Sequence, residues 1–259
     1  MMKKEKSAYN IQTVCHALDV LEQFHGDSDE LGFTDLCKSL KFHKNKVFRL
    51  LATLESRNFI EQNKETTGYR LGLKNLQLGQ TFVKQTGLIR QARTVLEALT
   101  GSCEETSYVA IMKDFQIIYL DAIESELPVR VASRVGKRLP FYCTAVGKVL
   151  AAGVDSQSLR AYFKNTELTR FTPNTITDPD ELSKHLAMTA ELGYAVDDEE
   201  LNIGVKCVGA PIRDYTKRVV GALSVSAPSM RFTSERMNMH LIPLVKDAAD
   251  QLSARLGYK

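Results

Sequence analysis

The feature that most constrains this chain is residues 34–57, where apolar and basic side chains separate onto opposite faces of a predicted helix. In the second half of this segment apolar residues recur at spacings of three and four, which is typical of one buried helix face. No acidic residue lies between Lys38 and Arg49. A helix that packs on a small domain and also lies against phosphates needs this division. Taken alone, the segment is equally typical of a solvent-exposed basic helix. The apolar residues are Val47, Leu50, Leu51 and Leu54, and the basic ones are Lys38, Lys41, Lys44, Lys46 and Arg49.

The residues that follow predict a two-stranded hairpin, with strands at 59–63 and 69–71 and Gly68 in the turn between them. Ahead of the basic segment, a first helix is expected over 11–24, capped by Asn10, and Thr34 can cap a second one. Helix, helix, basic helix and hairpin is the order of a winged helix-turn-helix. We therefore predict a DNA-binding domain over residues 10–72.

Charge is distributed unevenly along the chain. Residues 38–64 hold seven basic and two acidic residues, a local charge of +5, whereas the 259 residues together carry only +3. One region therefore suits a polyanion and the remainder does not. The length exceeds that of most single domains, which favours two domains.

The composition also excludes several classes of protein. The five cysteines are widely spaced without a CxxC pair, the histidines are scattered, and no apolar run is long enough to span a membrane. The N-terminal residues lack the apolar stretch of a secretion signal. No GxSxG, P-loop or HExxH motif is present. We predict a reduced, cytoplasmic protein without metal, cofactor, membrane contact or enzymatic activity.

A linker helix is predicted over residues 73–86. Its apolar residues cover more than one stripe of the helix surface, so it either packs on its own domain or pairs with a second copy. We favour the dimerisation helix, because two DNA half-sites one helical turn apart require a dimer. The apolar residues are Leu73, Leu76, Leu78, Phe82 and Val83.

Residues 87–259 mix helical and strand patterns, which predicts an α+β domain with an antiparallel sheet flanked by helices. Strands are expected at 107–112, 116–122, 129–133, 194–197, 207–213 and 219–226, and helices at 88–100, 144–152, 157–163, 179–191 and 233–256.

Three places in this domain carry groups that can bind a ligand. Thr144 can cap a helix whose first amides, at Ala145 and Val146, favour an anion, and Gly147 would let a ligand come close. An ordinary capped helix fits the same residues. Four acidic residues, 197–200, follow a predicted strand and are also typical of a solvated loop. Alternation places Ser224 and Ser226 on one strand face, where they either point into a cavity or bond to their own backbone.

These segments together resemble the IclR family of bacterial transcription regulators over nearly the whole chain. The resemblance rests on the basic helix from Lys44 to Glu55, on the stretch from Leu139 to Lys148, and on a spaced signature in the second domain. Arg213 departs from this signature, and Asn45 and Lys46 stand where small hydroxyl residues are usual. The signature residues are Gly193, Asp197, Glu200, Cys207, Val208, Gly209, Ile212 and Asp214.

The resemblance implies that residues 87–259 form a GAF-like domain that binds a small organic acid or a related metabolite. It also implies dimers through the DNA-binding domains and tetramers through the effector domains. The implied ligand contacts are Ala145, Val146, Asp197, Cys207, Ser224 and Ser226, within an apolar wall of Val131, Leu139 and Val205.

The leading hypothesis is a repressor that a metabolite controls. Lys44, Asn45, Lys46 and Arg49 are expected to enter the major groove of double-stranded operator DNA, because Asn suits adenine and Arg suits guanine. Contacts to phosphates are expected from Thr34, Lys38, Lys64 and Arg70. The alternative is a redox-sensing regulator that uses Cys103, Cys143 or Cys207.

Overall fold

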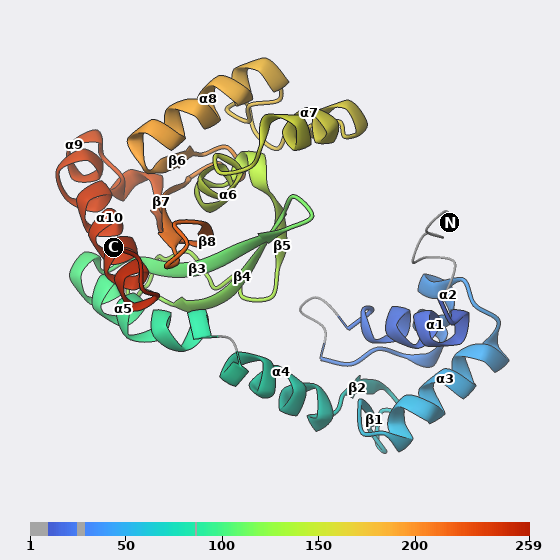
Figure 1. Ribbon diagram of the computed structural model, residues 1–259. Coiled ribbons are helices and arrows are strands. Elements are labelled where there is room, and N and C mark those ends of the chain that lie inside the picture. Colours follow the sequence, from blue (N-terminus) through green and yellow to red (C-terminus); the bar gives the residue numbers. More distant parts are fainter. Residues whose placement is uncertain (1–9, 25–28, 86) are drawn as a thin grey trace. The chain divides into compact units, whose positions relative to one another are not determined.

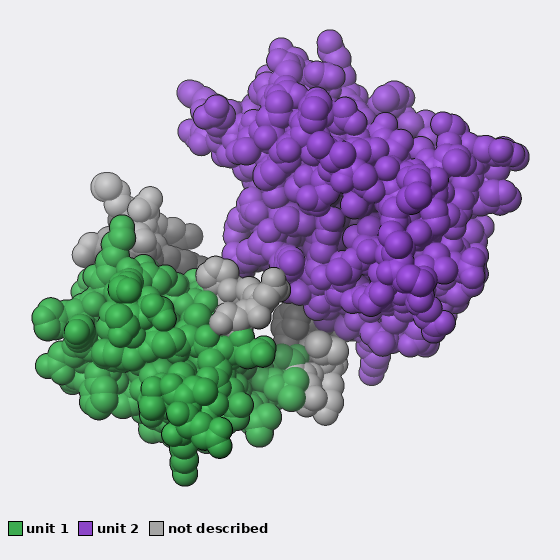
Figure 2. Space-filling view, turned by 180° about the vertical axis from the view of Figure 1, so that it is seen from behind, with its two compact units in different colours: residues 1–85 green, residues 86–259 purple. Residues whose placement is uncertain are grey.

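The computed structural model describes residues 10–24, 29–85 and 87–259, without the side chains of residues 80 and 82–85. The chain divides into two compact units, Met1–Gln85 and Thr86–Lys259 (Figure 2). Phe82 and Val83, which belong to the predicted dimerisation surface, lie outside the described side chains.

Unit 1 is a winged helix-turn-helix, as its sequence predicts. The predicted apolar stripe of the third helix is buried and meets residues of the other two helices and of the hairpin, including Val20, Leu36 and Ile60. A short bridge between Leu31 and Tyr69 joins the hairpin to the chain ahead of the second helix. The elements are α1 (Gln12–Leu21), α2 (Phe33–Leu40), α3 (Lys44–Ser56), β1 (Ile60–Gln62), β2 (Tyr69–Leu71) and α4 (Leu73–Gln85) (Figure 1).

Two predicted helix caps are wrong. Helix α2 begins at Phe33 with Gly32 at its N-cap, so Thr34 lies inside the first turn and its side chain caps nothing. The bridge at Leu31 holds the chain extended until Gly32, and the helix can start directly after it. Helix α1 has Ile11 rather than Asn10 at its N-cap, without a side-chain cap.

Unit 2 is built on one antiparallel sheet in the order β5-β4-β3-β8-β7-β6. The long central strands are apolar on both faces, because each face is covered by helices. Hairpins connect β3 to β4 and β7 to β8. The strands are β3 (Thr106–Lys113), β4 (Gln116–Ile123), β5 (Arg138–Pro140), β6 (Ala195–Asp198), β7 (Val205–Arg213) and β8 (Val219–Pro228).

The helices of unit 2 form a layer on each side of this sheet (Figure 1). α5 (Gly87–Cys103) and α10 (Ile242–Arg255) cover one face, where Leu96, Leu223 and Leu252 meet. The other face carries α6 (Ala145–Ala151), with α8 (Pro179–Leu192) packed on it. The remaining elements are α7 (Ser156–Asn165), α9 (Ser234–Arg236), the 3₁₀ turns Phe141–Cys143 and Ser229–Arg231, and a π-helical turn, Met237–Leu241.

One predicted strand of unit 2 is wrong, and one predicted helix is less regular than expected. Residues 129–133 form no strand, because the carbonyls of Val131 and Ala132 accept hydrogen bonds from the side chains of Thr106 and Tyr108 instead of a strand ladder. The predicted helix at 233–256 is confirmed, since residues 234–255 are helical throughout, but α9 and α10 within it are joined by the π-helical turn. Pro243, near the start of α10, has no N–H to donate to the preceding turn, so the regular ladder is interrupted there.

Candidate functional sites

The solvent-facing side of α3 carries three of the predicted base-reading residues. Lys44, Asn45 and Arg49 are exposed. Lys41 adopts a left-handed conformation (φ 54°) that ends α2, and α3 begins three residues later. Among the described residues, neither Lys44 nor Arg49 forms an ion pair, so both charges are available to a polyanion.

Phe48 is a surface residue that the sequence reasoning missed. Its side chain is 59% exposed on the same helix, next to Arg49. The helical period that places Val47, Leu50, Leu51 and Leu54 on the buried face leaves position 48 on the solvent side, so the sequence could have identified Phe48 as exposed. An exposed aromatic on such a helix can contact the methyl group of thymine.

Lys46 is placed differently from the other base-reading candidates. Its side chain is half-buried, with Nζ 3.3 Å from Nε2 of His16 and 4.0 Å from the ring centroid of Phe42. The ammonium group donates to the imidazole and therefore links α1 to α3. Lys46 still lines a surface hollow together with Asn45 and Arg49.

The four predicted phosphate contacts fall into two groups. Thr34, Lys38 and Lys64 are exposed, and Lys64 forms no ion pair with any other described residue. Arg70 is paired across the hairpin, with its Nε 2.6 Å from Oε1 of Glu61. A phosphate would have to compete with this carboxylate, which weakens the prediction for Arg70.

In unit 2, the predicted effector residues form a row across the sheet. Asp197 of β6 is opposite Cys207 of β7, Cys207 is opposite Ser226 of β8, and Ser226 is opposite Thr106 of β3. All four residues are buried, and Oγ of Ser226 donates to Sγ of Cys207 at 3.0 Å. Side chains two residues apart on a strand share a face, so Ser224 lies beside Ser226, as predicted.

Helix α6 lies directly on this face. A Cβ added at Gly209 of β7 would stand 3.2 Å from the backbone of Ala145 and Val146, so the glycine permits close contact between strand and helix. Thr144 caps α6 by accepting from the amide of Gly147, as predicted. The role expected for Gly147 is wrong, because an added Cβ would stand 2.2 Å from the carbonyl oxygen of Phe141. The glycine makes room for this backbone rather than for a ligand.

A buried ion pair lies next to the row. Nζ of Lys148 is 2.5 Å from Oε1 of Glu200, and Lys148 is 0% exposed. Oδ1 of Asp197 accepts the backbone amide of Glu200 at 2.8 Å. Oε2 of Glu200 is buried without a hydrogen-bond partner among the described residues. The sequence reasoning missed Lys148 as a buried cation.

Burial is the main cause of the shifted pKa values of the titratable groups in and near this row. Burial raises the pKa of Asp197 from 3.8 to about 6, and the charge of Glu200 adds to the rise, against the hydrogen bond from its amide. Burial also raises the pKa of Cys207, of Cys143 to about 12, and of Cys103. The three thiols are therefore protonated at neutral pH, and a thiol is far less reactive than a thiolate.

The predicted apolar wall is only partly assembled. Val131 is buried above the end of β3. Val205 lies two residues before Cys207 on β7, on the same face of the strand, and is half-buried. Leu139 lies on β5 at the opposite edge of the sheet, four strands from Cys207, where it packs on the core beneath α6. Arg134, a cation that the sequence reasoning missed, opposes the rise in the pKa of Asp197 through its positive charge.

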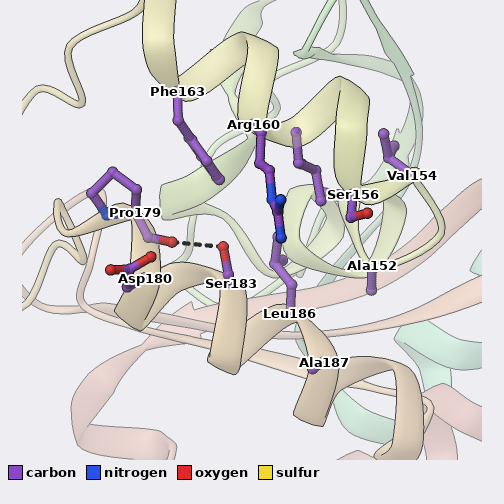
Figure 3. Close-up of a pocket in the computed structure, with 12 residues that line it drawn as sticks. Ala152, Val154, Ser156, Arg160, Phe163, Pro179, Asp180, Ser183, Leu186 and Ala187 are labelled. Carbon is purple, nitrogen blue, oxygen red and sulfur yellow. Dashed lines mark hydrogen bonds between the residues drawn. The ribbon is translucent and has the colours of Figure 1, made fainter.

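A separate groove of about 420 Å³ lies between α7 and α8 (Figure 3). Arg160 extends from α7 towards α8, and the hydroxyl of Ser183 bonds to the carbonyl of Pro179. None of the nine predicted effector residues lines this groove.

Residues 10–24, 29–85 and 87–259 contain neither a metal-binding cluster nor a membrane-spanning helix. No cluster of three or more histidine, cysteine and acidic side chains is positioned to hold a metal ion. No described helix combines the length and the apolar character needed to cross a bilayer.

Comparison with known proteins agrees with both units. A family model described as the bacterial transcriptional regulator IclR C-terminal domain matches residues 80–254, and the IclR helix-turn-helix model matches residues 13–64. The Escherichia coli regulator XynR is 35% identical over 248 residues, covering 96% of this chain and 98% of XynR. The E. coli repressor AllR is 30% identical, covering 98% of this chain and 93% of AllR.

The fold also matches solved structures. An IclR homologue from Microbacterium hydrocarbonoxydans, crystallised with 4-hydroxybenzoate, has a TM-score of 0.83. It covers 95% of this chain and 99% of its own at 20% identity, so this likeness supports the fold alone.

Proposed function

Because this chain belongs to the IclR family of bacterial transcriptional regulators, we propose that it represses its target genes until a small organic acid binds in unit 2. The observation that carries the proposal is the buried row of polar side chains from Asp197 to Ser226, which three neighbouring strands align on one face of the sheet. A relative named as a repressor, AllR, supports the direction of control.

DNA binding is assigned to residues 10–72. Lys44, Asn45 and Arg49 would read base edges from the exposed side of α3, and Phe48 would contact thymine. Thr34, Lys38 and Lys64 would bind phosphates and fix the orientation of the domain without reading sequence. Lys46 would contribute charge from its position beside His16, and Arg70 only after releasing Glu61.

A dimer is supported by apolar surfaces on α1 and α4. Val14 and Leu18 of α1 are exposed at helical spacing, and so are Leu73 and Leu76 of α4. Exposed apolar stripes on two helices of one unit are typical of a surface that a partner covers. We propose a second copy of this chain as the partner, in a homodimer or a homotetramer, with linker residues 73–86 at the contact.

Effector binding is assigned to residues 87–259. Ser224, Ser226, Cys207 and Asp197 would bind oxygen atoms of the ligand, together with the amides of Ala145 and Val146. Helix α6 has only seven residues, so those amides would act as single donors rather than through a helix dipole.

The redox alternative is weaker. It needs a thiolate at Cys103, Cys143 or Cys207, but all three thiols are buried and have raised pKa values. DNA affinity that responds to peroxide and is restored by reductant would favour this alternative.

The test uses the full-length protein and labelled DNA fragments from the region upstream of its own gene. Arg49→Ala is expected to lose 5- to 150-fold in affinity, since a base contact contributes about 1–3 kcal/mol. Ser224→Ala is expected to bind DNA like wild type but to respond less to a panel of small carboxylates. Wild-type binding by Arg49→Ala would contradict the DNA assignment, and an unchanged response of Ser224→Ala would contradict the effector assignment.

A further inference from the structure

Residues 131–136 lie beside Thr106, at the end of the buried row that runs from Asp197 through Cys207 and Ser226. Oγ1 of Thr106 donates to the carbonyl of Val131 at 2.8 Å, and the hydroxyl of Tyr108 donates to the carbonyl of Ala132 at 2.9 Å. The carbonyl of Tyr119 accepts the amide of Gly136 at 3.0 Å. Thr106 is paired with Ser226, and Tyr108 with Ser224. The segment is therefore fixed at both ends next to the two serines.

Arg134 lies in the middle of this segment. Its side chain is partly buried, and Nη2 donates to Oδ1 of Asn202 at 3.1 Å, in the loop between β6 and β7. The side chain thus reaches from residues 131–136 towards the edge of the sheet that holds Asp197. The backbone on either side of Arg134 is bonded to Tyr108 and Tyr119, so the guanidinium starts from a point between these tyrosines and Asn202.

This guanidinium has no carboxylate partner among the described residues. Its one hydrogen bond there is to the neutral amide of Asn202, which leaves most of its five donors unused. By contrast, the partly buried Arg231 and Arg236 both pair with Glu105, at 2.6 Å and 2.9 Å. A partly buried cation that lacks an anion is suited to an anion supplied from outside the chain.

The hydroxyl groups of two buried residues near Arg134 also lack partners. Ser224 is 2% exposed and Tyr119 is 5% exposed, and neither side chain bonds to another described residue. Tyr119 packs edge-on against Tyr108, which is the strand neighbour of Ser224. Oε2 of Glu200 is the one unpaired side-chain oxygen or nitrogen among the described residues that is fully shut off from solvent, so both hydroxyl oxygens remain open to the oxygen atoms of a ligand.

We propose that Arg134 binds the carboxylate of the effector, while Ser224 and Tyr119 bind its hydroxyl or carbonyl oxygens. This inference rests on the proposed function and narrows it to an acid with a second oxygen function. A planar guanidinium pairs with a carboxylate through two parallel hydrogen bonds, which a neutral amide cannot reproduce. Arg134 would therefore set the preference of the site for acids.

The experiment measures binding of matched acids and amides to the full-length protein by calorimetry. The probes are lactate, gluconate and 4-hydroxybenzoate, each compared with its primary amide. For at least one pair, wild type is expected to prefer the acid by about 10- to 100-fold, as for a charged hydrogen bond. Arg134→Gln is expected to bring the acid-to-amide ratio close to one, and Arg134→Lys to restore part of it.

The matched control is Arg138→Gln, which removes the same charge from an exposed position four residues away. It is expected to keep the wild-type ratio. The proposal for Arg134 is overturned if Arg134→Gln keeps the ratio, or if wild type binds acid and amide equally well.

A second control separates this proposal from the proposed function. Ser224→Ala is expected to weaken the acid and the amide alike. If Ser224→Ala weakens both but Arg134→Gln keeps the ratio, the ligand site stands and the role of Arg134 fails. If wild type binds none of the six probes, or Ser224→Ala changes no affinity, both proposals fail.

Discussion

The carboxyl group of Asp197 illustrates a conflict between ligand binding and stability at the scale of one residue. It is 2% exposed, and burial raises its pKa from 3.8 to about 6. The folded state therefore binds this proton more tightly than the unfolded state does. Stability from this group is highest below pH 3.8, falls as the pH rises from 3.8 to 6, and is constant above pH 6.

We expect Asp197→Asn to stabilise the protein at pH 7.5 by about 1–3 kcal/mol. At this pH the carboxyl group of Asp197 is ionised although burial has raised its pKa from 3.8 to about 6, so its charge opposes folding, and asparagine carries no such charge. The asparagine oxygen can still accept the amide of Glu200. The gain should shrink as the pH falls to 4.5, as measured by urea unfolding at both pH values. Asp198→Asn is the control, since Asp198 is exposed beside Lys206. Equal stability of Asp197→Asn and wild type at pH 7.5 would contradict the argument.

Residues of unit 2 were predictable from the sequence where a strand or helix pattern controls them. The alternation of side chains along a strand is enough to place Ser224 and Ser226 on one face. Threonine is a preferred N-cap residue, which identifies Thr144 as the start of a helix. Lys148 and Arg134 were not predictable in this way. The burial of Lys148 depends on Glu200, which lies 52 residues later, and the position of Arg134 depends on Asn202.

At the scale of elements, the contact between α6 and β7 controls how close the ligand-binding groups lie. Gly209 permits this contact, because an added Cβ would meet backbone atoms of Ala145 and Val146 at 3.2 Å and the carbonyl oxygen of Leu223 at 3.3 Å. Backbone atoms cannot rotate away as the end of a side chain can. A methyl group at this position must push helix and strand apart.

We expect Gly209→Ala to destabilise the protein by about 1–3 kcal/mol and to weaken effector binding, because an overpacked contact displaces α6. Thermal or urea unfolding measures the first effect. Gly153→Ala is the matched control, since its added Cβ would meet only atoms at 3.6 Å or more. Equal stability of the two variants would show that the contact can relax without cost.

The same scale shows which elements a sequence pattern determines. The apolar stripe on α3 was predicted correctly because it depends only on the order of residues in the sequence, where apolar residues recur with the helical period of 3.6. Residues 129–133 have strand-like composition, but distant side chains at Thr106 and Tyr108 hold their carbonyls. The π-helical turn ahead of α10 follows from Pro243, a local signal that the apolar periodicity of the helix obscured.

For the whole molecule, charge separates the two activities that we propose. Unit 1 holds 13 basic and 10 acidic residues, a net charge of +3, whereas unit 2 holds 21 of each and is neutral. Attraction to DNA should therefore come from unit 1 alone, and a dimer should present each cation twice. Each phosphate that a cation neutralises contributes about 0.9 to the steepness of log affinity plotted against log salt concentration. This slope therefore measures how many lysines and arginines contact phosphates.

We expect Lys38→Gln to reduce the steepness of this dependence by about 1.8, because one lysine is lost from each of two DNA-binding domains. The measurement is DNA affinity of the full-length protein across a series of potassium chloride concentrations. Lys184→Gln, an exposed lysine of α8, is the control and should leave the slope unchanged. A reduction near 0.9 would mean that one domain binds at a time, and no reduction would remove Lys38 from the phosphate contacts. A reduction in the Lys184→Gln control would show that unit 2 also contacts the duplex, which would contradict the assignment of DNA binding to unit 1 alone.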